Sequence, residues 1–268
     1  GLGVLVTPTY YAALSMSLMI TALKDVREVA KYKGQVIYAG GDDVLALLPA
    51  ETALVTTRNL RDNYWGDEMG FHKVRDYLFA APRLLGFGRS FSVRYVNIMD
   101  IMSAEIKEAT RLLEEEAKKI RWDFPGFRSV EKDAVVVSES RTKKSAVLPL
   151  TTPKQLLAPR TPHKDLSVLN VLNQLFVMRL GGALSGNLPE DYERYRKVVE
   201  RVDCRSGVVE DAWSYVVGRN AAGEDAKRFL SLDVLENCGV DRCAKASPEG
   251  GFLLTQIVNA YEILRGYP

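Results

Sequence analysis

The sequence is poor in cysteine and histidine, has almost no net charge and lacks a long apolar run. Its 268 residues include three cysteines and two histidines. So sparse and odd a cysteine count excludes a secreted disulfide scaffold and favours an intracellular, cytoplasmic protein. The 36 basic and 34 acidic residues leave a net charge of +2, so any contact with nucleic acid must come from a local patch. The most apolar stretch, residues 10–23, is too short to cross a membrane, and we expect no membrane partner.

The three cysteines leave two interpretations open. Cys238 and Cys243 are separated by four residues and could begin a zinc site with Cys204 as a third ligand. Both histidines are distant in sequence, so we favour buried thiols, or one disulfide in a heat-adapted protein.

The first half of the sequence alternates between helical and strand periodicity. Thr7-Pro8-Thr9 is a helix start, and Gly34 stops that helix. Two apolar runs around Gly40-Gly41-Asp42-Asp43 predict a β-hairpin with buried strands. We expect a second helix over 49–64, an insertion with one or two helical turns over 65–88, a helix over 103–119, and strands over 90–98, 133–139 and 145–148. This order predicts an α+β fold: a ferredoxin-like palm domain, residues 1–148, whose first strand is missing.

A proline-rich, basic connector follows at residues 149–163. Residues 141–164 contain no acidic residue, and their cations are either a solvated linker or a strip that contacts RNA or nucleotide phosphates. Beyond it the strand signals vanish. We expect a C-terminal helical bundle over 164–268, with helices at about 165–180, 189–202, 207–217, 223–237 and 251–264.

The adjacent carboxylates Asp42 and Asp43 are the most informative residues for chemistry. Two like charges side by side raise each other's pKa unless a cation lies between them. Mg²⁺ prefers carboxylate oxygens together with substrate phosphates, so the pair predicts a divalent metal site. Gly40 and Gly41 have no Cβ and would let a phosphate approach backbone N–H groups. The alternative is an ordinary turn, because Gly and Asp are common turn residues.

Residues 38–49, YAGGDDVLALLP, resemble the signature of the large subunit of type III CRISPR effector complexes, of the Cas-ten or Cmr type. Three other segments agree with this family in order and spacing, namely residues 7–15, 88–90 and 112–118. The resemblance is specific over about 7–140 and looser over 164–268. It implies a C-terminal fragment of the subunit, with a GGDD palm domain followed by a helical domain.

The resemblance implies an enzyme that converts ATP into cyclic oligoadenylate when its complex recognises target RNA. Asp42 and Asp43 would hold two divalent metals, Mg²⁺ or Mn²⁺, and Gly40 and Gly41 would lie beneath the triphosphate. Ser15 would approach ATP, and Lys118 could meet phosphate charge. The implied partners are a small helical subunit, an adjacent repeat-type subunit, crRNA and target RNA.

The sequence departs from the family pattern in two places. Tyr11 stands where the family has a histidine, and the carboxylate that palm enzymes place on their first strand is expected upstream of Gly1. Two alternatives remain open. One is another nucleotidyl cyclase, such as a diguanylate cyclase, although Val44 follows the aspartates where GGDEF enzymes have Glu-Phe. The other is a non-catalytic scaffold.

Overall fold

The computed structural model describes residues 7–65, 71–74, 77–80, 89–127, 129–152, 167–247 and 251–266. The chain folds into two compact units, Gly1–Arg89 and Ser90–Pro268. Within the described ranges, no helix has both the length and the hydropathy needed to span a membrane.

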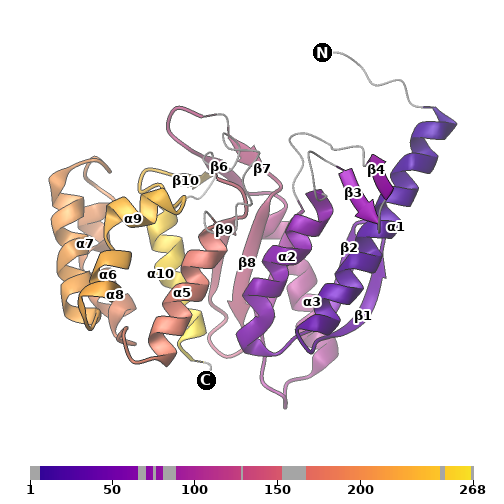
Figure 1. The fold of residues 1–268 in the computed structure, drawn as a ribbon. Helices are drawn as coiled ribbons and strands as arrows, with labels where there is room; N and C mark the ends of the chain where they lie inside the picture. The colour runs from indigo at the N-terminus through magenta and orange to yellow at the C-terminus, as the bar shows by residue number, and fades with distance from the viewer. Residues whose placement is uncertain are drawn as a thin grey trace. The chain divides into compact units, whose positions relative to one another are not determined.

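The first unit is built on a long helix and a hairpin (Figure 1). Helix α1 (Pro8–Lys31) packs on strand β1 (Gln35–Gly40) and on helix α2 (Ala53–Trp65). Strand β1 pairs antiparallel with β2 (Asp43–Leu47), and a 3₁₀ turn (Ala50–Thr52) leads from β2 into α2. A second hairpin, β3 (Phe71–Val74) and β4 (Tyr77–Ala80), follows α2.

Both ends of α1 follow from local sequence. The Thr7 side chain accepts a hydrogen bond from the Tyr10 N–H, and Pro8 occupies the first turn, where a missing donor costs nothing. At the other end Lys33 adopts a left-handed φ of 59°, and the N–H groups of Lys33 and Gly34 donate to the carbonyls of Ala30 and Val29. This is a Schellman motif, which directs the chain from α1 into β1.

A buried ion pair ties α1 to the end of the first unit. Asp25 and Arg89 are both buried, and their side chains meet at 2.6 Å. The Asn63 amide of α2 also donates to Asp25. The desolvation of Asp25 raises the pKa of its carboxyl group, although Arg89 and Asn63 oppose the rise.

The second unit contains a three-stranded sheet in the order β5-β8-β9. Strand β8 (Ala134–Glu139) runs parallel to β5 (Phe91–Tyr95) and antiparallel to β9 (Ser145–Pro149). Every residue of β8 is buried. Helix α3 (Met102–Leu112) continues as a π-helical turn (Leu113–Ala117) that covers one side of the sheet, and helix α10 (Leu253–Leu264) packs on β8 and β9. Because both faces of β8 are covered, side chains on either face are buried, which explains the uninterrupted apolar run Val135-Val136-Val137.

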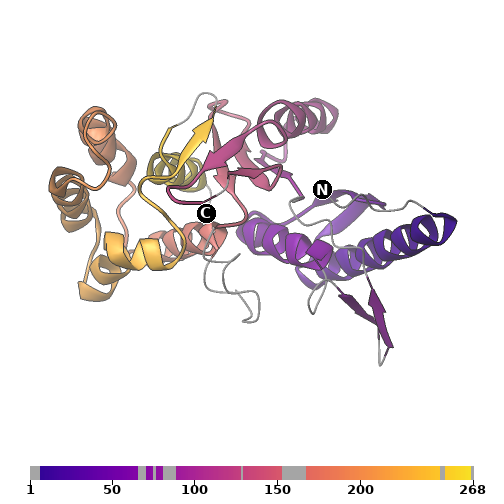
Figure 2. The same cartoon turned by 90° about the horizontal axis from the view of Figure 1, so that it is seen from above.

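Five further helices belong to the second unit. They are α5 (Val168–Leu180), α6 (Leu188–Val199), α7 (Gly207–Asn220), α8 (Glu224–Phe229) and α9 (Leu232–Asn237). A second small sheet has the order β10-β6-β7, from β10 (Lys245–Ser247), β6 (Arg121–Asp123) and β7 (Val130–Glu131). Figure 2 shows β10 as the yellow arrow beside the pink strands.

The predicted α+β class is confirmed, as are the GGDD hairpin and most helices. Four predictions about local structure are wrong. The strands of the hairpin are not buried: a bulge at Ile37 leaves Ile37 and Tyr38 both exposed. The insertion over 65–88 forms the hairpin β3–β4 in its described part, where helical turns were expected. The helix over 223–237 is two helices, α8 and α9, and the C-terminal half contains strand β10.

The cysteines form a disulfide rather than a zinc site. Cys204 and Cys243 are bonded, and Cys238 lies outside this bond. No group of three metal-binding side chains occurs in the part of the chain that the structure describes. Residues 153–166, most of the predicted connector, lie outside the described residues, and the domain boundaries at 148 and 164 stay a prediction.

Candidate functional site

The GGDD segment forms the tip of the β1–β2 hairpin. Gly40 pairs with Asp43, so Gly41 and Asp42 are the two turn residues. Gly41 has a φ of +63°, and a positive φ at the first turn position with glycine is the type II′ pattern favoured in hairpins. A Cβ on Gly40 would lie 2.9 Å from the Tyr38 hydroxyl, whereas one on Gly41 would meet nothing within 4 Å. The turn therefore needs glycine at 41 for its backbone, whereas a side chain at 40 would only require the exposed Tyr38 ring to shift.

Asp42 and Asp43 are both exposed at this tip. Neither carboxylate has an ion pair or hydrogen bond to any residue in the described ranges. Two unpaired neighbouring carboxylates are a hard-oxygen donor pair, which matches the way Mg²⁺ is held by one or two carboxylates plus substrate phosphates and water. No third acidic or metal-binding residue of the described part joins them. The pair therefore fits a metal ion that arrives with a phosphate ligand.

Tyr64 of α2 is a neighbour of the site that sequence reasoning missed. Burial raises the pKa of its phenol, and the charge of Asp42 raises it further. Arg89 opposes that rise and lies over the Tyr64 ring, 5.7 Å from its centroid. Arg89 is itself paired with Asp25. No local pattern marks Tyr64, since its position depends on how α2 packs.

The hairpin tip contains four of the six predicted site residues, Gly40 to Asp43. Ser15 is exposed in the same unit, on α1. Lys118 belongs to the second unit, directly after the π-helical turn, and its ammonium lies 2.6 Å from the Glu114 carboxylate. A Lys118 contact with phosphate would therefore have to compete with Glu114.

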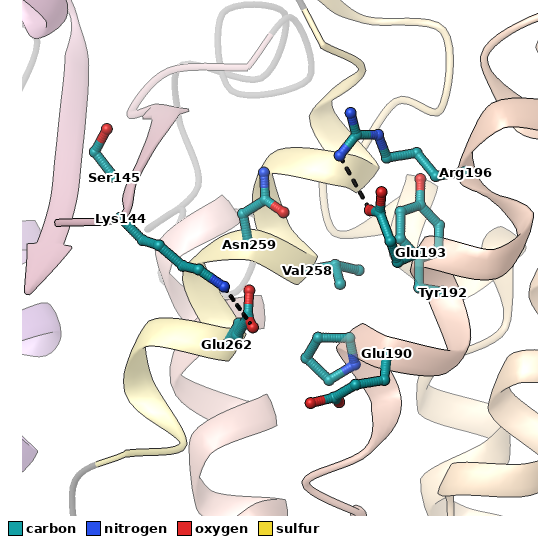
Figure 3. A pocket seen from close by; sticks show the side chains of 10 residues that line it. Lys144, Ser145, Glu190, Tyr192, Glu193, Arg196, Val258, Asn259 and Glu262 are labelled. Carbon is teal, nitrogen blue, oxygen red and sulfur yellow. Dashed lines mark hydrogen bonds and ion pairs between the residues drawn. The ribbon is translucent and has the colours of Figure 1, made fainter. Parts of the chain in front are cut away.

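A separate cavity of about 530 Å³ lies in the second unit, between α6, α10 and the start of β9 (Figure 3). Its charged side chains are already paired: Lys144 with Glu262 at 2.8 Å, and Arg196 with Glu193 at 3.0 Å. None of the six predicted site residues lines it. Glu190, the remaining charged residue of the lining, pairs with Arg265 at 2.6 Å. Because its charged side chains are already paired, the cavity offers no free set of ligands, and the hairpin tip remains the candidate site.

Comparison with known proteins finds a family match over part of the chain. The model of Cas10/Cmr2, second palm domain, matches residues 4–123. The CRISPR system CMR subunit Cmr2 of Saccharolobus solfataricus is 27% identical over 214 residues, which are 75% of this chain and 20% of that protein. The corresponding Cmr2 of Pyrococcus furiosus is 43% identical over 58 residues, 22% of this chain and 7% of that protein.

Two solved structures share the fold. One is the type III-B Cmr-beta complex in its apo state, with a TM-score of 0.74 and 23% identity over 98% of this chain and 26% of that chain. The other is Cmr-beta bound to cognate target RNA, with a TM-score of 0.74 and 22% identity over 98% of this chain and 27% of that chain. The chain thus spans about a quarter or less of these relatives.

Proposed function

We propose that the Gly40–Asp43 hairpin tip is the nucleotidyl-transfer site of a type III CRISPR large subunit, because residues 4–123 match the model of the Cas10/Cmr2 second palm domain. Its substrate would be ATP and its product cyclic oligoadenylate, made when the complex recognises target RNA. The observation that carries the proposal is the pair of exposed, unpaired carboxylates at a glycine turn.

In the proposed reaction a ribose hydroxyl of one ATP attacks the α-phosphorus of another. A new P–O bond forms, the bond to the β-phosphate oxygen breaks, pyrophosphate leaves, and the hydroxyl proton passes to solvent. Mg²⁺ or Mn²⁺, when bound, supplies the positive charge that stabilises this transfer.

The residues of the chain have separate tasks in this proposal. Asp42 and Asp43, both exposed, would hold the metal through their carboxylate oxygens. Gly41 leaves open space where a side chain would stand, so the phosphates can approach the turn backbone. Ser15 would contact ATP from α1, and Lys118 would meet phosphate charge after release from Glu114.

The proposed partners are those of a multisubunit ribonucleoprotein. The solved relatives are Cmr-beta complexes, one of them bound to target RNA. We propose that the full subunit adjoins a small helical subunit and a repeat-type subunit, and that crRNA and target RNA reach it through the complex.

The test uses the full-length large subunit in its RNA-loaded complex, incubated with labelled ATP and Mn²⁺. Asp42→Asn/Asp43→Asn keeps the turn and removes both charges, and should lower oligoadenylate formation by roughly a hundredfold or more. Glu51→Gln, an exposed carboxylate of the same unit, is the matched control and should leave activity unchanged.

Other products would contradict the proposal. A cyclic dinucleotide made from GTP would indicate another nucleotidyl cyclase. Absence of any product from an intact, RNA-bound complex would indicate a scaffold. Equal activity of the Asp42→Asn/Asp43→Asn variant and the control would show that the hairpin tip is not the site.

A further inference from the structure

The loop between β5 and α3, residues 96–101, exposes large apolar side chains that have no part in the proposed reaction. Ile98 is 97% exposed, Met99 87% and Ile101 73%. Scattered apolar residues are normal on a surface, but three within four positions concentrate apolar side chains on one short loop, which we call the apolar patch. Such patches mark sites of interaction with other macromolecules.

Hydrogen bonds hold this loop in one conformation. The Asn97 N–H donates to Asp100 Oδ2 at 2.7 Å, and the Met99 N–H donates to Asn97 Oδ1 at 3.1 Å. The Ser140 hydroxyl, from the end of β8, donates to the same Asp100 oxygen at 2.6 Å. The loop is therefore preorganised, and presenting Ile98 and Met99 to a partner costs little conformational entropy.

The turn between β8 and β9, residues 140–144, adds positive charge next to the apolar loop. Arg141 and Lys143 are exposed, and neither forms an ion pair within the described ranges. The hydrogen bond from Ser140 to Asp100 holds this turn against the loop, and the charges of Arg141 and Lys143 lower the pKa values of Asp100 and Glu108 respectively. Asp100 is held by Ser140 and Glu108 by Arg111. The rim of the patch is therefore cationic and unpaired.

We propose that the β5–α3 loop and the β8–β9 turn together bind a separate protein subunit. The binding surface of that subunit would be an apolar pocket edged by Asp and Glu side chains. The apolar patch would fill the pocket, and Arg141 and Lys143 would face the carboxylates. Protein interfaces are enriched in Met and Arg and surround an apolar centre with a polar rim. RNA is the less suitable occupant, because single-stranded bases stack on aromatic side chains and this loop has none.

This proposal rests on the proposed place of the chain in a multisubunit complex and not on its catalytic activity. We would place p-benzoylphenylalanine at position 98 of the full-length large subunit, reconstitute the cognate type III-B complex with crRNA, and irradiate it. The expected product is a cross-link to a second protein subunit, at a peptide that contains apolar and acidic residues. A cross-link to RNA alone, a cross-link within the large subunit alone, or none at all would overturn the proposal.

A binding measurement separates the contributions of the patch and its rim. Ile98→Ser/Met99→Ser should weaken the binding of the large subunit to the other assembled subunits about tenfold or more. Arg141→Glu/Lys143→Glu should weaken it too, and its effect should shrink at high salt. Val177→Ser/Leu180→Ser removes two exposed apolar side chains of α5 and is the matched control. Equal losses in the control and the loop variant would refute a specific docking surface, whatever the complex does with ATP.

Discussion

Loss of Asp25 should destabilise the first unit far more than loss of an exposed charge. The Asp25 and Arg89 side chains meet at 2.6 Å and are only 1% and 6% exposed. In Asp25→Ala the guanidinium would remain buried without its carboxylate, which costs about 3–5 kcal/mol. The raised pKa of Asp25 shows that desolvation offsets much of the attraction within the pair. Replacing both residues, as Asp25→Leu/Arg89→Met, should therefore cost far less than either single change.

Urea unfolding followed by far-UV circular dichroism measures these differences. Lys227→Ala removes an exposed ion pair with Glu224 and is the control, with an expected cost below about 0.5 kcal/mol. A loss of under about 1 kcal/mol for Asp25→Ala would refute the argument from burial. So would a double variant whose loss equals the sum of the two single losses.

Three further predictions concern packing, the disulfide and alkaline stability. Gly34→Ala should lower the free energy of unfolding by about 1–3 kcal/mol, because its Cβ would lie 2.8 Å from the Leu47 carbonyl oxygen. A thermal unfolding curve unchanged from wild type would contradict this. Reduction of Cys204–Cys243, with a sequence separation of 39, should lower the unfolding free energy by about 4 kcal/mol in wild type and by nothing in Cys204→Ser. Burial raises the pKa of Tyr192 to about 12. The folded state thus favours the neutral phenol, so its stabilisation is complete below pH 10 and is lost as the pH rises to about 12, by about 2–3 kcal/mol. Tyr192→Phe should show a correspondingly smaller loss in denaturation measured at each pH.

The sequence predicted correctly those helices and turns whose ends are set by a few neighbouring residues. Thr7-Pro8 and Gly34 mark the ends of α1, and the adjacent glycines and aspartates mark the hairpin turn, because each depends on a few neighbouring residues. Strand β10 could not be predicted in this way. Its three residues pair with β6 more than a hundred positions earlier, and no local periodicity carries that information.

The candidate site also has features that local sequence predicts and features that depend on packing. The like charges of Asp42 and Asp43 beside two glycines are readable from sequence, whereas Tyr64 comes near Asp42 only through the packing of α2. Ser15 and Lys118 were predicted from the family resemblance alone. The exposure of the hairpin strands also escaped prediction, because apolar composition does not say which face of a sheet is covered.

The most direct test of the paired aspartates is anomalous diffraction from crystals soaked with Mn²⁺ and ATP. We expect a manganese peak within bonding distance of the Asp42 and Asp43 carboxylates, with the triphosphate of ATP against the Gly41 turn. Manganese and ordered ATP bound elsewhere, with both carboxylates directed into solvent, would contradict a nucleotide site at the hairpin tip.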